Sequence, residues 1–127
     1  MLRTDIVNPH LLSLLARVRH TNTLVIADRG FPFWPQIEVI DISLTVDVPT
    51  VLDVLRVLQA NFTAGKAWMA SEFLDNNEPQ VRDEFLSLLP PVTFELHSDF
   101  KLRVPRAIGL IRTAGTAQFF NVIMESA

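Results

Sequence analysis

The spacing of apolar residues changes along the chain between a helical period and an extended one, and this change predicts the secondary structure. After the pair Asn8-Pro9, a favourable helix start, apolar residues recur at helical spacing at Leu11, Leu12, Leu14, Leu15 and Val18. This pattern predicts a helix that ends at His20. Residues 23–27 are apolar at every position except the first, which is typical of a strand covered on both faces.

The rest of the chain continues to alternate between strands and helices. Further helices are predicted from Thr50 to about Asn61, from Pro79 to about Leu89, and from Ser98 onward. Further strands are predicted at 38–42, 66–70, 92–96, 107–112 and 121–124. This order indicates an α/β protein in which helices enclose a sheet, a three-layer α/β/α sandwich. With 127 residues and short connections, the chain is expected to form a single domain.

The composition of the chain limits which binding partners and which cellular compartment are expected. The chain is 49% hydrophobic with a mean hydropathy of +0.27, so we expect apolar surface to be buried between subunits as well as under helices. A net charge of -3 without a basic stripe argues against nucleic acid as a partner. No secretory signal is visible, and no apolar run approaches the ~18 residues of a membrane span. Without cysteine, disulfides and thiolate chemistry are excluded, and the cytoplasm is the expected location.

Three polar residues stand at predicted junctions between elements, where side chains can reach a cleft. His20 precedes the strand 23–27, Asp28 follows it, and His97 follows the strand predicted at 92–96. For any one of them alone, a capping or packing role is the more common one. Together they form a candidate acid/base group, because imidazole exchanges protons near neutral pH. Two histidines and a carboxylate also match a non-haem metal site, although no known metal-binding spacing occurs.

Several residues near these junctions suit a sugar ligand. Lys101 follows His97 by four positions and is either a solvated lysine or a cation that binds hydroxyl groups. The side-chain amide of Asn121 can both donate to and accept from a hydroxyl. The aromatic residues of predicted loops pack in the core or between subunits, or stack on a sugar ring: Phe31, Phe33, Trp34, Phe119 and Phe120. No phosphate-binding loop or nucleophile-elbow motif occurs, so nucleotide binding and serine hydrolase chemistry have no support.

Nearly the whole chain resembles the D-ribose pyranase and L-fucose mutarotase family in the order of its motifs. The resemblance begins with His20-Thr21-Asn22-Thr23-Leu24-Val25, followed by Asp28-x-Gly30-x-Pro32. Further matches follow at Ile40-Asp41-x-x-Leu44-Thr45, Val48-Pro49, Glu72 with Asn77-x-Pro79, His97-x-x-Phe100-Lys101, Ile111-Arg112-Thr113-x-Gly115 and Asn121-Val122-Ile123. Because the matches cover the chain in order, they are more specific than any single motif.

The resemblance implies a single α/β/α domain and a ring-shaped homo-oligomer, commonly a decamer. It also implies interconversion of the cyclic forms of a free monosaccharide without a cofactor. His20 matches the proposed proton donor of the family. The sugar-binding positions match Asp28, His97, Lys101 and Asn121. Position 119 also belongs to the sugar pocket, but Phe119 stands where the family usually has tyrosine, and this chain contains no tyrosine.

The leading hypothesis is therefore a cytoplasmic isomerase, a sugar pyranase or mutarotase that opens the ring of a free aldose such as D-ribose. His20 is the candidate acid. Asp28 orients His20 or grips a hydroxyl, and His97 is the second proton-transfer or binding group. Two alternatives remain. One is a non-catalytic sugar-binding protein, favoured by the missing tyrosine. The other is a metal-dependent enzyme that uses His20, Asp28 and His97.

Overall fold

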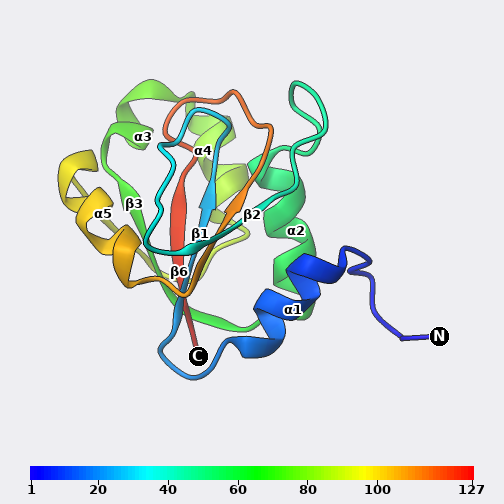
Figure 1. Cartoon of the computed structure of the whole chain (residues 1–127). Coiled ribbons are helices and arrows are strands. Elements are labelled where there is room, and N and C mark those ends of the chain that lie inside the picture. The colour runs from blue at the N-terminus through cyan, green and yellow to red at the C-terminus, as the bar shows by residue number, and fades with distance from the viewer.

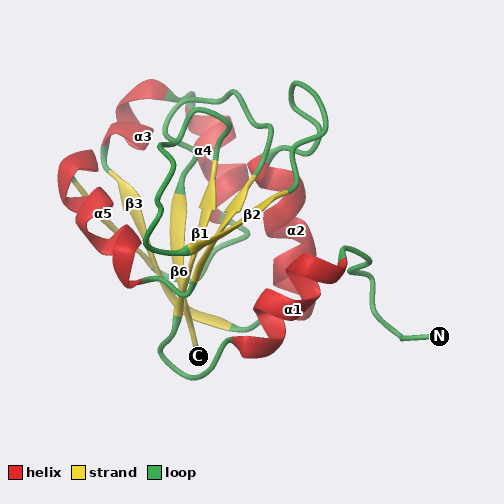
Figure 2. Cartoon of the chain, viewed as in Figure 1, coloured by secondary structure: helices red, strands yellow, loops and turns green.

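The computed structural model describes residues 1–127 as six strands in one sheet, with helices on both of its faces (Figure 1, Figure 2). The strands are β1 (Thr23–Ala27), β2 (Glu38–Asp41), β3 (Ala64–Ala70), β4 (Val92–Glu95), β5 (Gly109–Arg112) and β6 (Val122–Ser126). The helices are α1 (Pro9–Arg17), α2 (Val51–Asn61), α3 (Glu72–Asn76), α4 (Pro79–Leu86) and α5 (His97–Arg103), followed by a 3-10 turn at Val104–Arg106. None of the helices combines the length and hydrophobicity that crossing a bilayer requires.

The order of the strands places most of their carboxyl ends at the same edge of the sheet. The order is β2-β5-β1-β6-β3-β4, and only β6 runs antiparallel to its neighbours. The amino end of β6 therefore lies beside the carboxyl end of β1. This arrangement brings Asn121, just before β6, next to Asp28, just after β1. In α/β sheets this edge is the usual place for a ligand.

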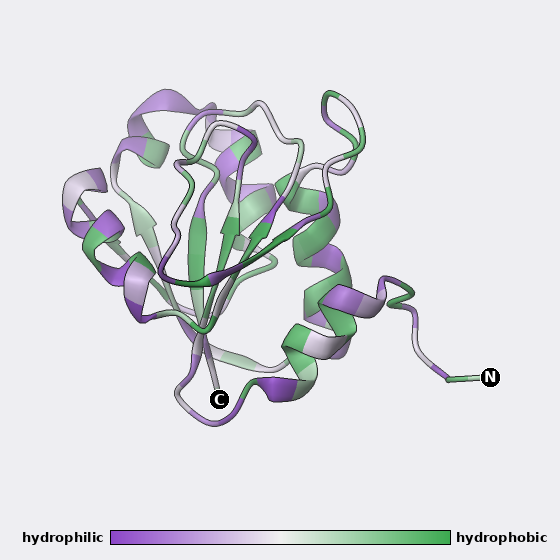
Figure 3. Ribbon diagram, in the orientation of Figure 1, coloured by the Kyte–Doolittle hydropathy of each residue, from purple (hydrophilic) through white to green (hydrophobic).

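The predicted three-layer sandwich is confirmed by the alternation of side chains along β1. Leu24 and Ile26 point to one face, where they pack with residues of α1, α2 and α4. Val25 and Ala27 point to the other face, where they pack with Phe100 of α5. Figure 1 shows α1, α2 and α4 on one side of the sheet and α5 on the other, and Figure 3 shows hydrophobic residues along the central strands. The second face is covered by one short helix together with the loop between β1 and β2.

Some boundaries differ from those predicted. Helix α1 ends at Arg17 because Val18 takes an extended conformation, so His20 lies in the turn beyond the helix. The short helix α3 was not predicted. Helix α4 ends at Leu86, three residues before the predicted end at Leu89. Helix α5 begins at His97, one residue before the predicted start at Ser98.

Candidate active site

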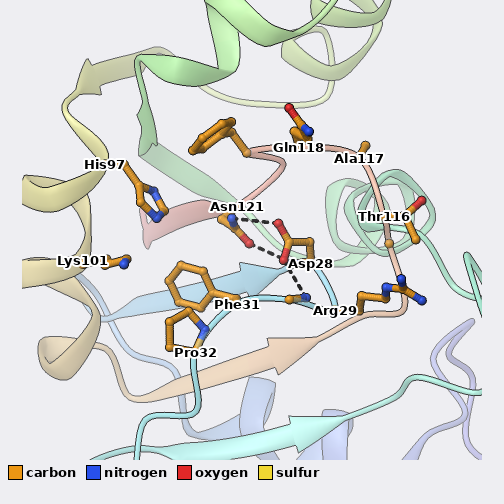
Figure 4. Close-up of a pocket in the computed structure, with 13 residues that line it drawn as sticks. Asp28, Arg29, Phe31, Pro32, His97, Lys101, Thr116, Ala117, Gln118 and Asn121 are labelled. Carbon is orange, nitrogen blue, oxygen red and sulfur yellow. Dashed lines mark hydrogen bonds between the residues drawn. The ribbon is translucent and has the colours of Figure 1, made fainter.

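A pocket of about 660 Å³ opens at the carboxyl edge of the sheet (Figure 4). One wall is the loop 28–32 after β1, and a second wall is the loop 115–119 before β6. His97 and Lys101 of α5 form the third wall, and Asn121 lies at the base. The structure therefore brings together five of the six residues predicted for the site: Asp28, His97, Lys101, Phe119 and Asn121.

Asp28 is held by hydrogen bonds at the centre of this pocket. Its Oδ2 accepts from Asn121 Nδ2 at 3.0 Å, and its Oδ1 accepts from the backbone N–H of Gly30 at 2.9 Å. The backbone N–H of Asp28 donates in turn to Asn121 Oδ1 at 2.8 Å. Asn121 was expected to contact a hydroxyl of the ligand, but both ends of its amide are engaged with Asp28. Its first role in the structure is to orient the carboxylate.

Arg112 supports the wall formed by the loop 28–32, and the sequence alone did not predict a role for it in the site. From the end of β5, its guanidinium donates to four carbonyl groups of the loop after β1. The shortest of these hydrogen bonds joins Nη1 to the carbonyl of Phe31 at 2.7 Å. An arginine at the carboxyl end of a predicted buried strand is the sequence signal for such a contact. Arg112 fixes the loop that carries Asp28.

His97 lies against aromatic rings on the opposite side of the pocket. Its ring meets Phe31 and Phe119 edge to face, with centroids 6.3 Å and 5.4 Å away, and stacks on Phe100 at 6.1 Å. Burial lowers the pKa of His97 below the usual 6.5, and the charge of Lys101 acts in the same direction. The carboxylates of Glu72 and Asp28 oppose this shift. The imidazole is thus neutral near pH 7 and able to accept a proton.

Replacing Lys101 by methionine is expected to raise the pKa of His97, because it removes a positive charge that disfavours the imidazolium ion. In the wild-type protein the pKa of folded His97 lies below that of the unfolded chain, so this group costs stability as pH falls below about 6.5. Lys101→Met reduces that loss. Imidazole NMR titration, assigned with a His97→Gln variant, measures the shift. Lys66→Met is the matched control, and an equal shift in both variants would contradict the assignment.

The loop before β6 holds Phe119 in a conformation that L residues rarely adopt. Its φ is 59°, in the left-handed region, which costs about 1 kcal/mol or more in a non-glycine residue. The next residue, Phe120, is buried against Phe73 and Phe85. Asn77 Nδ2 also donates to the carbonyl of Gln118 at 3.1 Å. The packing of Phe120 and the hydrogen bond from Asn77 hold the loop in place. In this conformation the ring of Phe119 contacts the ring of His97.

The structure does not bring His20 into this pocket. His20 is exposed in the turn before β1, whereas Asp28 follows the strand. The five residues of β1 separate them by roughly 16 Å at about 3.3 Å per residue. The expectation that His20, Asp28 and His97 form one group within a chain is therefore wrong, because a strand carries its two ends to opposite edges of the sheet. The catalytic role of His20 stays a prediction.

The same separation bears on the metal hypothesis. The three proposed ligands, His20, Asp28 and His97, do not meet in one chain. No other group of three or more histidine, aspartate or glutamate side chains has the arrangement of a metal site. The metal-dependent alternative has no support from the geometry of a single chain.

Comparison with known proteins places this chain and its fold in one family. The RbsD / FucU transport protein family matches residues 1–127. D-ribose pyranases from Coprothermobacter proteolyticus and Bacillus cereus are 31% and 32% identical to the chain, covering 99% of it and 97% of each relative. The structure of Bacillus subtilis RbsD complexed with D-ribose matches with a TM-score of 0.93 at 29% identity, over 100% of this chain and 98% of that one. The fucose mutarotase of Streptococcus pneumoniae, solved with L-fucose, shares the fold with a TM-score of 0.82 at 16% identity, over 100% and 98% of the two chains. On this evidence the chain belongs to the RbsD/FucU family.

Proposed function

We propose that the protein is an isomerase that interconverts the cyclic forms of a free aldose such as D-ribose by acid/base-assisted ring opening. The observation that carries this proposal is a fixed carboxylate, Asp28, in a pocket shared with His97, whose pKa is lowered. Relatives that cover almost the whole chain are D-ribose pyranases, which supports the same reaction class.

Ring opening needs two proton transfers on the sugar. A base removes the proton of the anomeric hydroxyl while an acid protonates the ring oxygen, and the bond between the anomeric carbon and the ring oxygen breaks. The open-chain aldehyde then closes again, either through another hydroxyl or on its other face. Each positioned acid or base typically contributes ~10²–10⁴-fold. Neutral His97 suits the base, and Asp28 suits a hydroxyl acceptor that holds the sugar.

The acid in this proposal is His20 of a neighbouring chain. Since His20 and the pocket lie at opposite edges of the same sheet, head-to-tail docking of one chain on the next is an arrangement that brings His20 to a pocket. Head-to-tail contacts are heterologous, and they close into a ring when the rotation between chains permits. The geometry therefore supports the proposed ring-shaped homo-oligomer, with a decamer as one form. The proposed location is the cytoplasm, in keeping with the lack of cysteine.

Saturation-transfer NMR on a panel of aldoses tests the proposed activity. With protein present, the exchange rate between ring forms of at least one sugar, D-ribose first, is expected to rise. Unchanged rates for ribose, fucose and other common aldoses would contradict the proposal. His20→Ala is expected to abolish the increase while the pocket still binds sugar.

A non-catalytic sugar-binding protein is the second candidate. The observation in its favour is Phe119, which presents no hydroxyl to the pocket where the family usually has tyrosine. In that case sugar binds, and His20→Ala changes neither affinity nor exchange. The same NMR samples, titrated with sugar, separate the two functions.

A further inference from the structure

Glu72, at the start of α3 and outside the pocket lining, contacts the helix that carries His97. Its Oε1 and Oε2 both accept from the backbone N–H of His97 at 3.1 Å. Ser71 Oγ donates to Oε1 at 3.2 Å. Burial opposes the charge on this carboxylate, yet hydrogen bonds from the backbone amides of Glu72 and His97 hold its pKa below the usual value. The carboxylate is thus ionised where it meets α5.

Within the chain, the ring of His97 is held by its packing against Phe31, Phe100 and Phe119. Its Nδ1 is buried and makes no hydrogen bond within the chain, so no polar contact through that atom orients the ring. Leu96, which precedes α5, provides no side-chain cap. The polar contact of His97, the first residue of α5, is the hydrogen bond from its backbone N–H to the Glu72 carboxylate. Lys101 lies one turn further along the same helix, which buried Phe100 and the Arg103–Glu95 ion pair also anchor.

We propose that Glu72 is a positioning residue for the reaction, which holds His97 and Lys101 against Asp28 through the first turn of α5. The expected effect of Glu72 on catalysis rests on the proposed function. Its expected effect on the pKa of His97 does not. Three charged groups bear on that imidazole. Glu72 of α3 and Asp28 after β1 favour the imidazolium ion, and Lys101 of α5 disfavours it. Loss of the Glu72 charge therefore lowers the pKa of His97 further.

Two substitutions separate the geometric effect from the charge. Glu72→Ala removes the acceptor and the charge, and it is expected to lower the turnover number for sugar exchange about 100-fold, since small displacements of a reacting group cost this much. Glu72→Gln removes the charge and one of the two acceptor oxygens but keeps the other for the His97 N–H, so it is expected to recover about tenfold of that loss. Asp75→Asn is the matched control, because Asp75 is an exposed acid on the same short helix.

The experiment measures three quantities for the intact protein and each variant: exchange kinetics by NMR, the His97 titration midpoint, and the midpoint of thermal unfolding. Positioning by Glu72 predicts a reduced turnover in Glu72→Ala that Glu72→Gln partly recovers, while both variants lower the His97 midpoint through the lost charge and Asp75→Asn behaves like the wild-type protein. Unchanged turnover in Glu72→Ala, with or without a shifted His97 midpoint or a lower thermal stability, would overturn the inference. If the wild-type protein does not accelerate exchange of any sugar, the proposed function fails. The His97 midpoint then still decides whether Glu72 governs that residue.

Discussion

Equal mixing of His20→Ala and Asp28→Asn chains is expected to restore about a quarter of the wild-type exchange activity, although each variant alone is almost inactive. The reason is the separation of the two residues by strand β1. In a head-to-tail ring, each site takes its pocket from one chain and its histidine from the next. Half of the mixed sites have an intact pocket, and half of those face an intact His20. His20→Ala is expected to lose at least ~10²-fold, the typical contribution of one acid or base. Asp28→Asn is expected to lose about as much, because it weakens the acceptor that holds the sugar in place.

Saturation-transfer NMR on refolded or co-expressed mixtures measures this complementation. His10→Ala is the matched control, because His10 is an exposed histidine on α1 and is expected to keep full activity. A mixture as inactive as its components would show that His20 acts within its own chain or does not act at all. Full activity of His20→Ala alone would remove His20 from the mechanism.

Asn121→Asp is expected to lower both activity and stability, and to do so more strongly as pH rises. The substitution places a second carboxylate 3.0 Å from Asp28 Oδ2, where Asn121 Nδ2 now donates a hydrogen bond. Two carboxylates this close cannot both ionise, so the pair keeps a proton with a raised pKa. The folded chain then binds more protons than the unfolded chain, and stability falls as pH increases through that raised pKa. Above it we expect a loss of about 2–3 kcal/mol in the free energy of unfolding and ~10²-fold in exchange.

Urea denaturation and exchange kinetics at several pH values test this result. Asn121→Ala is the comparison, because it removes the bonds to Asp28 without adding a charge. The alanine variant is expected to lose stability to a similar extent at every pH. If Asn121→Asp has the pH profile of the alanine variant, the two side chains are not coupled as the structure places them.

Much of the fold was predictable because its strongest patterns are local. The apolar run 23–27 indicates a strand buried on both faces, and β1 is the strand between β5 and β6. Thr50 and Asp53 form the capping box that begins α2. Helix α3 was missed because it has only five residues with Phe73 as its buried member, too short for a helical period to show.

The site residues that directly follow parallel strands could be placed from the sequence. Asp28 and His97 each follow the carboxyl end of a strand that runs parallel to its neighbour, so their place at one edge follows from an α/β fold. The error over His20 came from treating nearness in sequence as nearness in space across a strand. The role of Asn121 as a support for Asp28 was beyond sequence reasoning, since the two are 93 positions apart and their bonding depends on the antiparallel course of β6.

The walls of the pocket differ in how freely they can change. Phe31 lines the pocket and is also part of the core beneath it, with 5% of its surface exposed. A substitution there alters ligand contacts and folding together. Residues 116–118 line the opposite wall and are exposed, so their side chains add little to the core. Thr116 is hydrogen-bonded to the carboxylate of Asp47, so a change of sugar preference is expected to cost the fold least at Ala117 and Gln118.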